Sequence, residues 1–292
     1  MVEAENAPVM SWRSEDVAGA PGEEARRAAH SPASLIVLAT NDLRNAAMRL
    51  CAAQLRPFAG DIARNAARHL EIVELAVAQR ANLVFFSELS LTGYEPRLAK
   101  SLASSAADPR LDVFQQRSDA YNIVIGIGLP IAANSGVQIG MVWFVPDTPR
   151  RLYTKQQLHV DEMSCFVPGS EQIIVEVAGW RLAPAICYES LQMSHADGVA
   201  CLGAEVYLAS VAKPAGNLAT AMLHYPAIAR RHAMYVIMAN CTGPCDDFVS
   251  AGQSAAWNSQ GERLAHMGSD SEGVVILDLD SGTASVHELA GV

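Results

Sequence analysis

The chain has 292 residues, half of them hydrophobic, which is enough apolar material for one large core or two smaller ones. Its net charge of −10 and the lack of any long basic run argue against a nucleic-acid partner, whose phosphates need a basic patch. No apolar run reaches the roughly 18 residues of a membrane span, and the first residues lack the basic-then-apolar order of a signal peptide. We therefore expect a cytoplasmic protein without a membrane partner.

The six cysteines do not form the pattern of a secreted disulfide framework. Cys241 and Cys245 are four residues apart, but no second Cys or His pair at zinc spacing follows them. We expect reduced thiols and no metal site.

Residues 1–47 are rich in Ala, Glu, Pro, Ser and Arg and have little apolar periodicity. Such a segment buries too little surface to offset its ordering entropy, so we expect a disordered or loosely packed extension, with 34–40 as its one strand-like stretch. Met48 is an alternative start, and the sequence leaves open whether the extension belongs to the functional protein. A single domain is predicted over 48–285.

Segments typical of strands and helices alternate through this domain. A strand begins at Met48, Asp61 is a typical N-cap, and apolar residues at helical spacing predict a helix over about 62–80. The apolar run 81–86 is typical of a strand covered on both faces. Further strands are predicted over 122–130, 137–145, 172–179, 181–187, 205–211, 234–240, 252–258 and 273–280, and helices within 95–120 and over 190–202 and 217–233. This alternation predicts an α/β fold with mixed sheets.

Three residues are candidates for catalysis, and for each of them the sequence also allows a purely structural role. Glu88 follows a buried strand, where burial would raise its pKa toward that of a general base, although a strand can also end on a solvated Glu. Lys155 could stabilise an oxyanion, or could form a surface pair with Glu162. Cys187 stands between a strand and a helix, where the helix dipole favours a thiolate, yet a free cysteine is more often a buried apolar residue.

Taken together and in order, the segments "FFSELSLTGY" (85–94), "YTKQQLHVDEMSCFVPG" (153–169) and "ICYES" (186–190) resemble the nitrilase superfamily, the carbon–nitrogen hydrolases. That family has Leu, Glu, Phe and Gly at three, seven, eleven and fourteen positions after its Lys. The resemblance extends over about 48–280. Its further marks are "QLRPFAGD" (54–61), "MANCTG" (238–243), "GQS" (252–254) and "SQGE" (259–262), and the offset residues here are Leu158, Glu162, Phe166 and Gly169.

The resemblance implies a four-layer αββα sandwich whose subunits form a homodimer or a higher homo-oligomer. It also implies a catalytic site that needs no metal and no organic cofactor. In that site Cys187 is the nucleophile, Glu88 the general base and Lys155 the oxyanion-stabilising cation. Glu162 corresponds to a second glutamate that orients the site, and the backbone N–H of Tyr188 completes the oxyanion hole.

Departures from the family pattern bear on the substrate. Tyr188 favours amides over nitriles, whose hydrolases commonly have Trp there, and Glu189 replaces the Asp of many amidases. Lys213 stands near the position of an aromatic substrate-binding residue in small-dicarboxylate amidases, where it could meet a substrate carboxylate or phosphate, or be solvated. The frequent "RAxEN" sequence is missing from 224–236. Our candidate substrate-binding residues are Tyr94, Glu189, Lys213 and His224. Tyr225 and His232, like His224, could lie at the edge of the pocket, although core or surface roles are favoured for these three.

The amidase-like branch of the family therefore gives the leading hypothesis, a hydrolase of small linear amides or N-carbamoyl compounds that forms an acyl thioester. Nitrile hydrolysis and N-acyl transfer by the same triad are alternatives. A non-catalytic scaffold or binding protein that keeps the fold is an alternative of another class.

Overall fold

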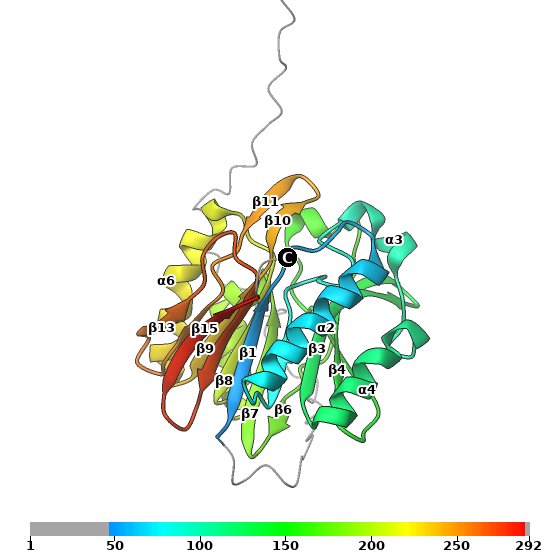
Figure 1. Ribbon diagram of the computed structural model, residues 1–292. Helices are drawn as coiled ribbons and strands as arrows, with labels where there is room; N and C mark the ends of the chain where they lie inside the picture. Colours follow the sequence, from blue (N-terminus) through cyan, green and yellow to red (C-terminus); the bar gives the residue numbers. More distant parts are fainter. Residues whose placement is uncertain (1–46, 290–292) are drawn as a thin grey trace, which may run out of the picture. The chain divides into compact units, whose positions relative to one another are not determined.

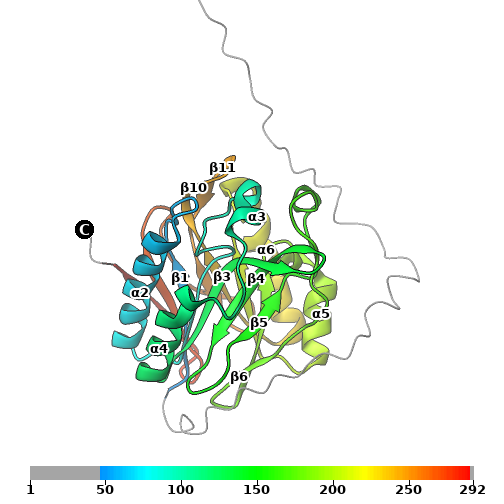
Figure 2. The same ribbon diagram turned by 90° about the vertical axis from the view of Figure 1, so that its right-hand side faces the viewer.

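The computed structural model describes residues 47–289, in which two β-sheets pack face to face and helices cover their outer faces (Figures 1 and 2). The expected N-terminal extension over 1–47, with its strand-like stretch at 34–40, lies outside the described residues except for Ala47. The four-layer αββα sandwich is confirmed, because separate apolar clusters fill the three spaces between successive layers.

The first sheet has seven strands within the described part of the chain, in the order β15-β14-β1-β2-β3-β4-β5. Its centre is parallel, since β1, β2 and β3 run in the same direction, whereas the outer strands are antiparallel to their neighbours. The strands are β1 (Arg49–Gln54), β2 (Leu83–Phe85), β3 (Val124–Ala133), β4 (Gly136–Phe144), β5 (Arg151–Thr154), β14 (Gly273–Asp278) and β15 (Thr283–Glu288).

The second sheet has six strands in the same described range, in the order β13-β12-β9-β8-β7-β6. Here β7, β8 and β9 form the parallel centre. A separate two-stranded hairpin, β10–β11, follows β9. The strands are β6 (Val175–Val177), β7 (Trp180–Ile186), β8 (Val206–Val211), β9 (Tyr235–Asn240), β10 (Thr242–Cys245), β11 (Phe248–Ala251), β12 (Ala255–Trp257) and β13 (Arg263–His266).

Helices α2 and α4 cover the outer face of the first sheet, and α5 and α6 cover that of the second (Figure 2). The predicted N-cap is confirmed, because the Asp61 carboxylate accepts a hydrogen bond from the Arg64 N–H. None of the helices in residues 47–289 combines the length and apolarity that a membrane crossing requires. The helices are α2 (Ile62–Ala78), α3 (Ala99–Leu102), α4 (Asp112–Tyr121), α5 (Met193–Cys201) and α6 (Ala215–His232).

The apolar run that contains β2 shows why the central strands carry almost no polar residues. Leu83 and Phe85 join the cluster between the two sheets, whereas Val84 and Phe86 join the cluster under α2 and α4. Both faces of the strand are thus removed from water, as its continuous apolar sequence predicts.

Several predicted elements differ in extent from those observed. The helix predicted over 190–202 is interrupted, because Gln192 is extended between a short 3-10 helix, Glu189–Leu191, and α5. The strand predicted over 252–258 shortens to β12, since Gly252 and Gln253 have positive φ angles. Three short strands, β10, β11 and β13, were not predicted, because alternation is hard to read in so few residues. The edge strand β15 was not predicted either, because it contains few apolar residues.

Candidate active site

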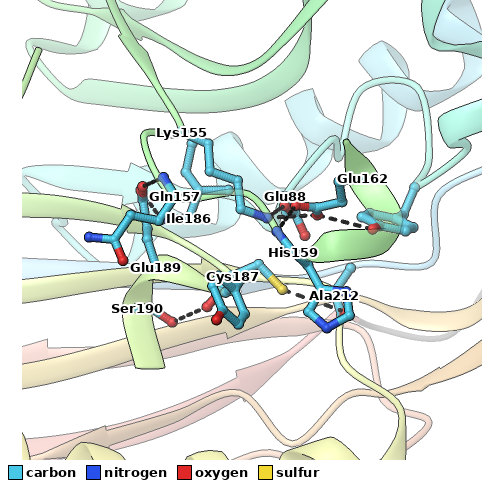
Figure 3. A network of polar contacts seen from close by, with 12 residues as sticks. Glu88, Lys155, Gln157, His159, Glu162, Ile186, Cys187, Glu189, Ser190 and Ala212 are labelled. Atoms are coloured by element: carbon cyan, nitrogen blue, oxygen red, sulfur yellow. Dashed lines mark hydrogen bonds and ion pairs between the residues drawn. The ribbon is translucent and has the colours of Figure 1, made fainter. Parts of the chain in front are cut away.

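The three residues predicted to carry the chemistry come together where strands of both sheets end (Figure 3). Glu88 follows β2, Lys155 directly follows β5, and Cys187 directly follows β7. Two of these strands belong to the first sheet and one to the second, so the site lies at one end of the sandwich.

Lys155 is held between two carboxylates in a fully buried ion cluster. Its Nζ lies 2.8 Å from Glu88 Oε1 and 2.7 Å from Glu162 Oε1. The side chains of Lys155 and Glu88 are 0 % exposed and that of Glu162 is 3 % exposed. Buried charges are tolerated when they are paired and hydrogen-bonded, and this cluster meets that condition for Lys155.

Glu162 is itself fixed by two further donors. The Tyr94 hydroxyl donates to Glu162 Oε1 at 3.1 Å, and the His159 backbone N–H donates to Oε2 at 2.8 Å. Because both oxygens are occupied, Glu162 can hold Lys155 in place, but it offers no free oxygen for proton transfer.

The spacing of the lysine motif follows from packing. Leu158 and Phe166 are buried in the cluster between the sheets. The Gly169 N–H donates to the Lys155 carbonyl at 2.7 Å, and a Cβ at Gly169 would lie 2.2 Å from Thr154 Oγ1 and 2.5 Å from the Thr154 carbonyl oxygen. Only glycine allows this approach, which fixes the backbone at Lys155.

Glu88 is positioned by a comparable close contact. A Cβ at Gly128 of β3 would lie 2.6 Å from the Ser87 carbonyl oxygen and 2.7 Å from the Leu89 N, on either side of Glu88. The second carboxylate oxygen, Oε2, has no hydrogen-bond partner in the described part of the chain. This oxygen is therefore available to accept a proton.

Cys187 has a backbone conformation that a non-glycine residue rarely adopts, with a φ of 49°. Its N–H donates to the Ser210 carbonyl at 2.9 Å, and its own carbonyl accepts from the Ser190 hydroxyl at 2.6 Å. Such strain costs on the order of 1–3 kcal/mol and occurs mainly at functional sites. The Cys187 Sγ lies 4.0 Å from the Ala212 carbonyl oxygen and 3.8 Å from Lys213 Nζ.

The environment sets distinct protonation states for the three groups. Burial, partly opposed by the Lys155 charge, raises the pKa of Glu88 to about 7. Burial and the Glu88 carboxylate raise the pKa of the Cys187 thiol to about 12, against the opposing charges of Lys213 and Lys155. Burial would lower the pKa of Lys155, but the carboxylates of Glu162 and Glu88 outweigh it and hold that pKa above its usual range. At neutral pH the site therefore contains a neutral thiol, a charged lysine and a carboxylate near its titration midpoint.

The backbone at Tyr188 supplies a free donor next to the thiol. Its N–H has no hydrogen-bond partner among residues 47–289, whereas the N–H groups of Cys187, Ser190 and Leu191 are all paired. The Tyr188 ring packs edge-on against His159, with 5.3 Å between ring centroids.

Glu189 has a different environment from the one expected of a substrate-binding residue. It is 0 % exposed, and its Oε1 accepts from the Ile186 N–H at 2.7 Å and the Tyr153 hydroxyl at 2.6 Å. Its Oε2 accepts from the backbone N–H groups of Gln156 at 2.7 Å and Gln157 at 3.2 Å. Glu189 thus joins the end of β7 to the segment that carries Lys155, and its oxygens are occupied by protein donors.

The other three candidate substrate-binding residues have contacts with the site or polar atoms without a partner. Tyr94 contacts Glu162 and packs on Phe248. Lys213 is adjacent to the thiol, and His224 on α6 has a buried Nε2 without a partner in the described residues. Burial and the Lys213 charge lower the pKa of His224.

Tyr225 lies in the core, and His232 is half-buried at the C-terminal end of α6. Tyr225 is fully buried beside Trp257 and interacts with the Ser190 hydroxyl at 2.7 Å, and His232 Nε2 lies 3.0 Å from Asp197 Oδ1.

Two functional-site residues were missed by the sequence reasoning. Ser190 fixes the Cys187 carbonyl, and His159 packs on the Tyr188 ring and donates its backbone N–H to Glu162 (Figure 3). Both belong to the quoted motifs, but a signal for their roles would have required the turn geometry after β7 and the 3-10 helix Val160–Glu162, which His159 caps. Within residues 47–289, no group of three or more His, Cys, Asp or Glu side chains is arranged to hold a metal ion.

Comparisons with known proteins identify the family of the chain. A sequence profile described as carbon–nitrogen hydrolase matches residues 49–287. A protein from Pseudomonas protegens described as a hydrolase in the pqqF 5′ region is 30% identical over 240 residues, which cover 80% of this chain and 83% of that protein. An (R)-stereoselective amidase from Pseudomonas sp. is 28% identical over 244 residues, covering 80% and 86% of the two chains.

A glutamine-dependent NAD(+) synthetase from Acinetobacter baylyi is 25% identical over 228 residues, which are 73% of this chain and 41% of the synthetase, so the chain spans less than half the length of that relative. The fold also resembles an amidase from Nesterenkonia sp. AN1, with a TM-score of 0.73 and 23% identity over 80% of this chain and 90% of that one. The profile match over most of the chain and the 30% identical relative show that the protein belongs to the carbon–nitrogen hydrolase family, the nitrilase superfamily.

Proposed function

We propose that this carbon–nitrogen hydrolase is a cysteine-dependent amidase. It cleaves the C–N bond of a small linear amide or N-carbamoyl compound through an acyl-thioester intermediate. The observation that carries the proposal is the convergence of Glu88, Lys155 and Cys187 at the ends of three strands, with Lys155 paired to Glu88 at 2.8 Å.

The first half of the reaction forms the thioester. Glu88 accepts the thiol proton of Cys187, and the sulfur attacks the carbonyl carbon of the substrate. The oxyanion that forms is stabilised by the Lys155 ammonium and the Tyr188 N–H, donors of the kind whose loss typically costs about 10²–10³ in rate. Glu88 then returns the proton to the nitrogen, and ammonia or an amine leaves.

The second half regenerates the enzyme. Glu88 removes a proton from a water molecule, the resulting hydroxide attacks the thioester carbon, and the same donors stabilise the second oxyanion. The C–S bond breaks, the thiolate regains the proton from Glu88, and the carboxylic acid departs. A base that both gives and takes protons works best near its own pKa, and the raised pKa of Glu88 supports this double role.

The buried setting of the triad supports catalysis over a scaffold role. A scaffold needs neither a strained Cys187 nor a carboxylate oxygen left without a partner at Glu88. The relatives described as amidase and as glutamine-dependent synthetase also suggest an amide substrate for this chain. Nitrile hydrolysis and N-acyl transfer by the same triad remain alternatives.

Incubation with a panel of short amides, N-carbamoyl compounds and nitriles, with ammonia as the readout, tests the proposal. We expect ammonia release from amides or carbamoyl compounds by the wild type, loss of that activity in Cys187→Ala, and retention of it in Cys201→Ala, which alters an exposed thiol on α5. Full activity in Cys187→Ala would overturn the assignment. Added hydroxylamine would divert a thioester to a hydroxamate, and a preference for amine acceptors over water would favour acyl transfer.

The homodimer and the cytoplasmic location remain predictions of the sequence. Light scattering of the purified full chain would measure the oligomeric state.

A further inference from the structure

A second buried lysine lies beside the nucleophile. Lys213 follows β8 and is 4 % exposed, and its Nζ lies 3.8 Å from Cys187 Sγ. Its backbone is firmly held, because its N–H donates to Asn240 Oδ1 at 2.9 Å and its carbonyl accepts from the Ala251 N–H at 2.9 Å. The Lys213 side chain therefore extends toward the thiol from a backbone that is held in place by hydrogen bonds.

The two lysines of the site differ in their charge partners. Lys155 has two carboxylates within 2.8 Å, whereas Lys213 forms no ion pair with any residue of the described range and has Cys187 Sγ as its only side-chain hydrogen-bond partner there. An ammonium taken out of water without a counter-charge is costly unless an anion joins it. A bound anion would therefore supply the counter-charge that the Lys213 ammonium lacks among the described residues.

The described part of the chain does not pair Lys213 with an anion. The Cys187 thiol is neutral in the resting enzyme, since its pKa is about 12. The nearby imidazoles are also unable to supply negative charge, because histidine is neutral or positive. Burial, together with the Lys213 charge, lowers the pKa of His224. The buried Nε2 of His224 has no partner among residues 47–289 and is a second candidate donor to the same anion.

We propose that Lys213 is a specificity-determining residue that binds a carboxylate of the substrate, so that the preferred substrates are short amides or carbamoyl compounds that carry a carboxylate close to the scissile carbonyl. The proposal rests on the amide-hydrolase function proposed above and narrows its substrate class.

The distance defines how close that carboxylate must be. A carboxylate oxygen bound to Nζ at about 2.8 Å lies no more than about 6.6 Å from Sγ. A carboxylate two or three bonds from the carbonyl carbon that the sulfur attacks falls within this limit, because carbon–carbon bonds of about 1.5 Å keep the two groups within about 4 Å of each other. Succinamate meets this condition on the acyl side, and N-carbamoylglycine meets it on the leaving-group side.

Kinetics with substrates matched in length test the charge preference. Butyramide, succinamate and 4-aminobutyramide are neutral, anionic and cationic amides, and N-ethylurea and N-carbamoylglycine form a neutral and anionic pair on the other side. For the wild type we expect kcat/KM to be about 10- to 100-fold higher for an anionic member than for its neutral counterpart, the factor expected for one hydrogen bond between charged groups.

The Lys213→Met variant keeps a side chain of similar length without the charge. We expect it to lose that preference, so that the ratio of kcat/KM for the anionic substrate to kcat/KM for the neutral one falls about 10- to 100-fold, to near one. Any change in thiol reactivity lowers both values alike and leaves this ratio unaffected. Lys100→Met, which removes an exposed lysine on α3, is the matched control and should behave as the wild type. An equal fall for neutral and anionic substrates in Lys213→Met would overturn the proposal and assign Lys213 to thiol activation.

Binding without turnover separates this proposal from the proposed function. In a Cys187→Ala background, calorimetry should show succinamate or N-carbamoylglycine binding at least about tenfold more tightly than butyramide or N-ethylurea, with the difference removed by Lys213→Met. If the wild type hydrolyses no amide, the proposed function fails, and this binding difference still decides whether the site selects carboxylates. Equal affinities for neutral and anionic compounds would refute a carboxylate site at Lys213.

Discussion

Lys155 and Glu88 form an ion pair that is entirely removed from solvent, with 2.8 Å between Nζ and Oε1. The pair leaves Glu88 Oε2 without a hydrogen bond in the described residues, so one oxygen is anchored and the other is free to exchange a proton. In the mechanism proposed above, a single carboxylate thereby serves two purposes, because it holds the oxyanion-stabilising cation and acts as the base toward Cys187.

Replacing Glu88 by Gln should remove the base while preserving the shape of the site. We expect kcat to fall by about 10²–10⁴, the usual contribution of a positioned general base. Ammonia release at saturating substrate measures the change, and Cys201→Ala, which alters an exposed thiol, is the control that should behave as the wild type. Wild-type turnover in Glu88→Gln would contradict the assignment of the base.

The pH profile should report the same carboxyl group. Glu88 is active as a base only when it is deprotonated, and its pKa is raised to about 7 from an ordinary value of 4.5. We therefore expect kcat/KM to rise with pH through about 7 and to level off above it. An acidic limb centred near pH 4.5 would show that the essential carboxyl has an ordinary pKa, which would contradict the assignment of buried Glu88 as the base.

The motifs could be recognised from the sequence because their spacing reflects local packing. Leu158, Phe166 and Gly169 recur at fixed offsets from Lys155 since two of them fill the core and the third allows the backbone to approach Thr154. Glu88 could be placed because an apolar strand covered on both faces leads into it. These relationships lie within one segment or one strand, where sequence patterns carry the information.

The structural role of Glu189 and the contact of Lys213 with the thiol could not be predicted in the same way. Three of the four donors to Glu189, on Tyr153, Gln156 and Gln157, are more than thirty positions away in the sequence, so its function depends on how β5 and β7 meet. The nearness of Lys213 to Cys187, 26 residues earlier, likewise depends on the parallel pairing of β7 with β8. Contacts across a sheet leave no periodic signal in a single sequence.

The buried carboxylate of Glu189 should matter more for stability than for binding. In Glu189→Gln, an amide N–H₂ would face the Gln156 and Gln157 N–H groups that Oε2 now accepts from, which leaves buried donors unpaired. We expect a loss of about 3 kcal/mol in the free energy of unfolding, measured in urea. Tyr153→Phe removes only one donor from the same carboxylate and should cost about 1 kcal/mol. Equal stabilities for Glu189→Gln and the wild type would mean that this carboxylate is not a structural tie.

The close approach at Gly169 gives the sharpest mutational contrast. In Gly169→Ala the new Cβ would lie 2.2 Å from Thr154 Oγ1 and 2.5 Å from the Thr154 carbonyl oxygen, so the backbone beside Lys155 must shift. We expect a loss of about 1–3 kcal/mol in stability and a fall in kcat, because the hydrogen bond from Gly169 to the Lys155 carbonyl would lengthen. Gly198→Ala is the matched control. Gly198 lies within α5 and a Cβ there would meet nothing within 4 Å, so the helical propensity of alanine should stabilise the protein by up to about 1 kcal/mol without changing kcat. If both variants gained stability and kept full activity, the contact between Gly169 and Thr154 would have no part in positioning Lys155.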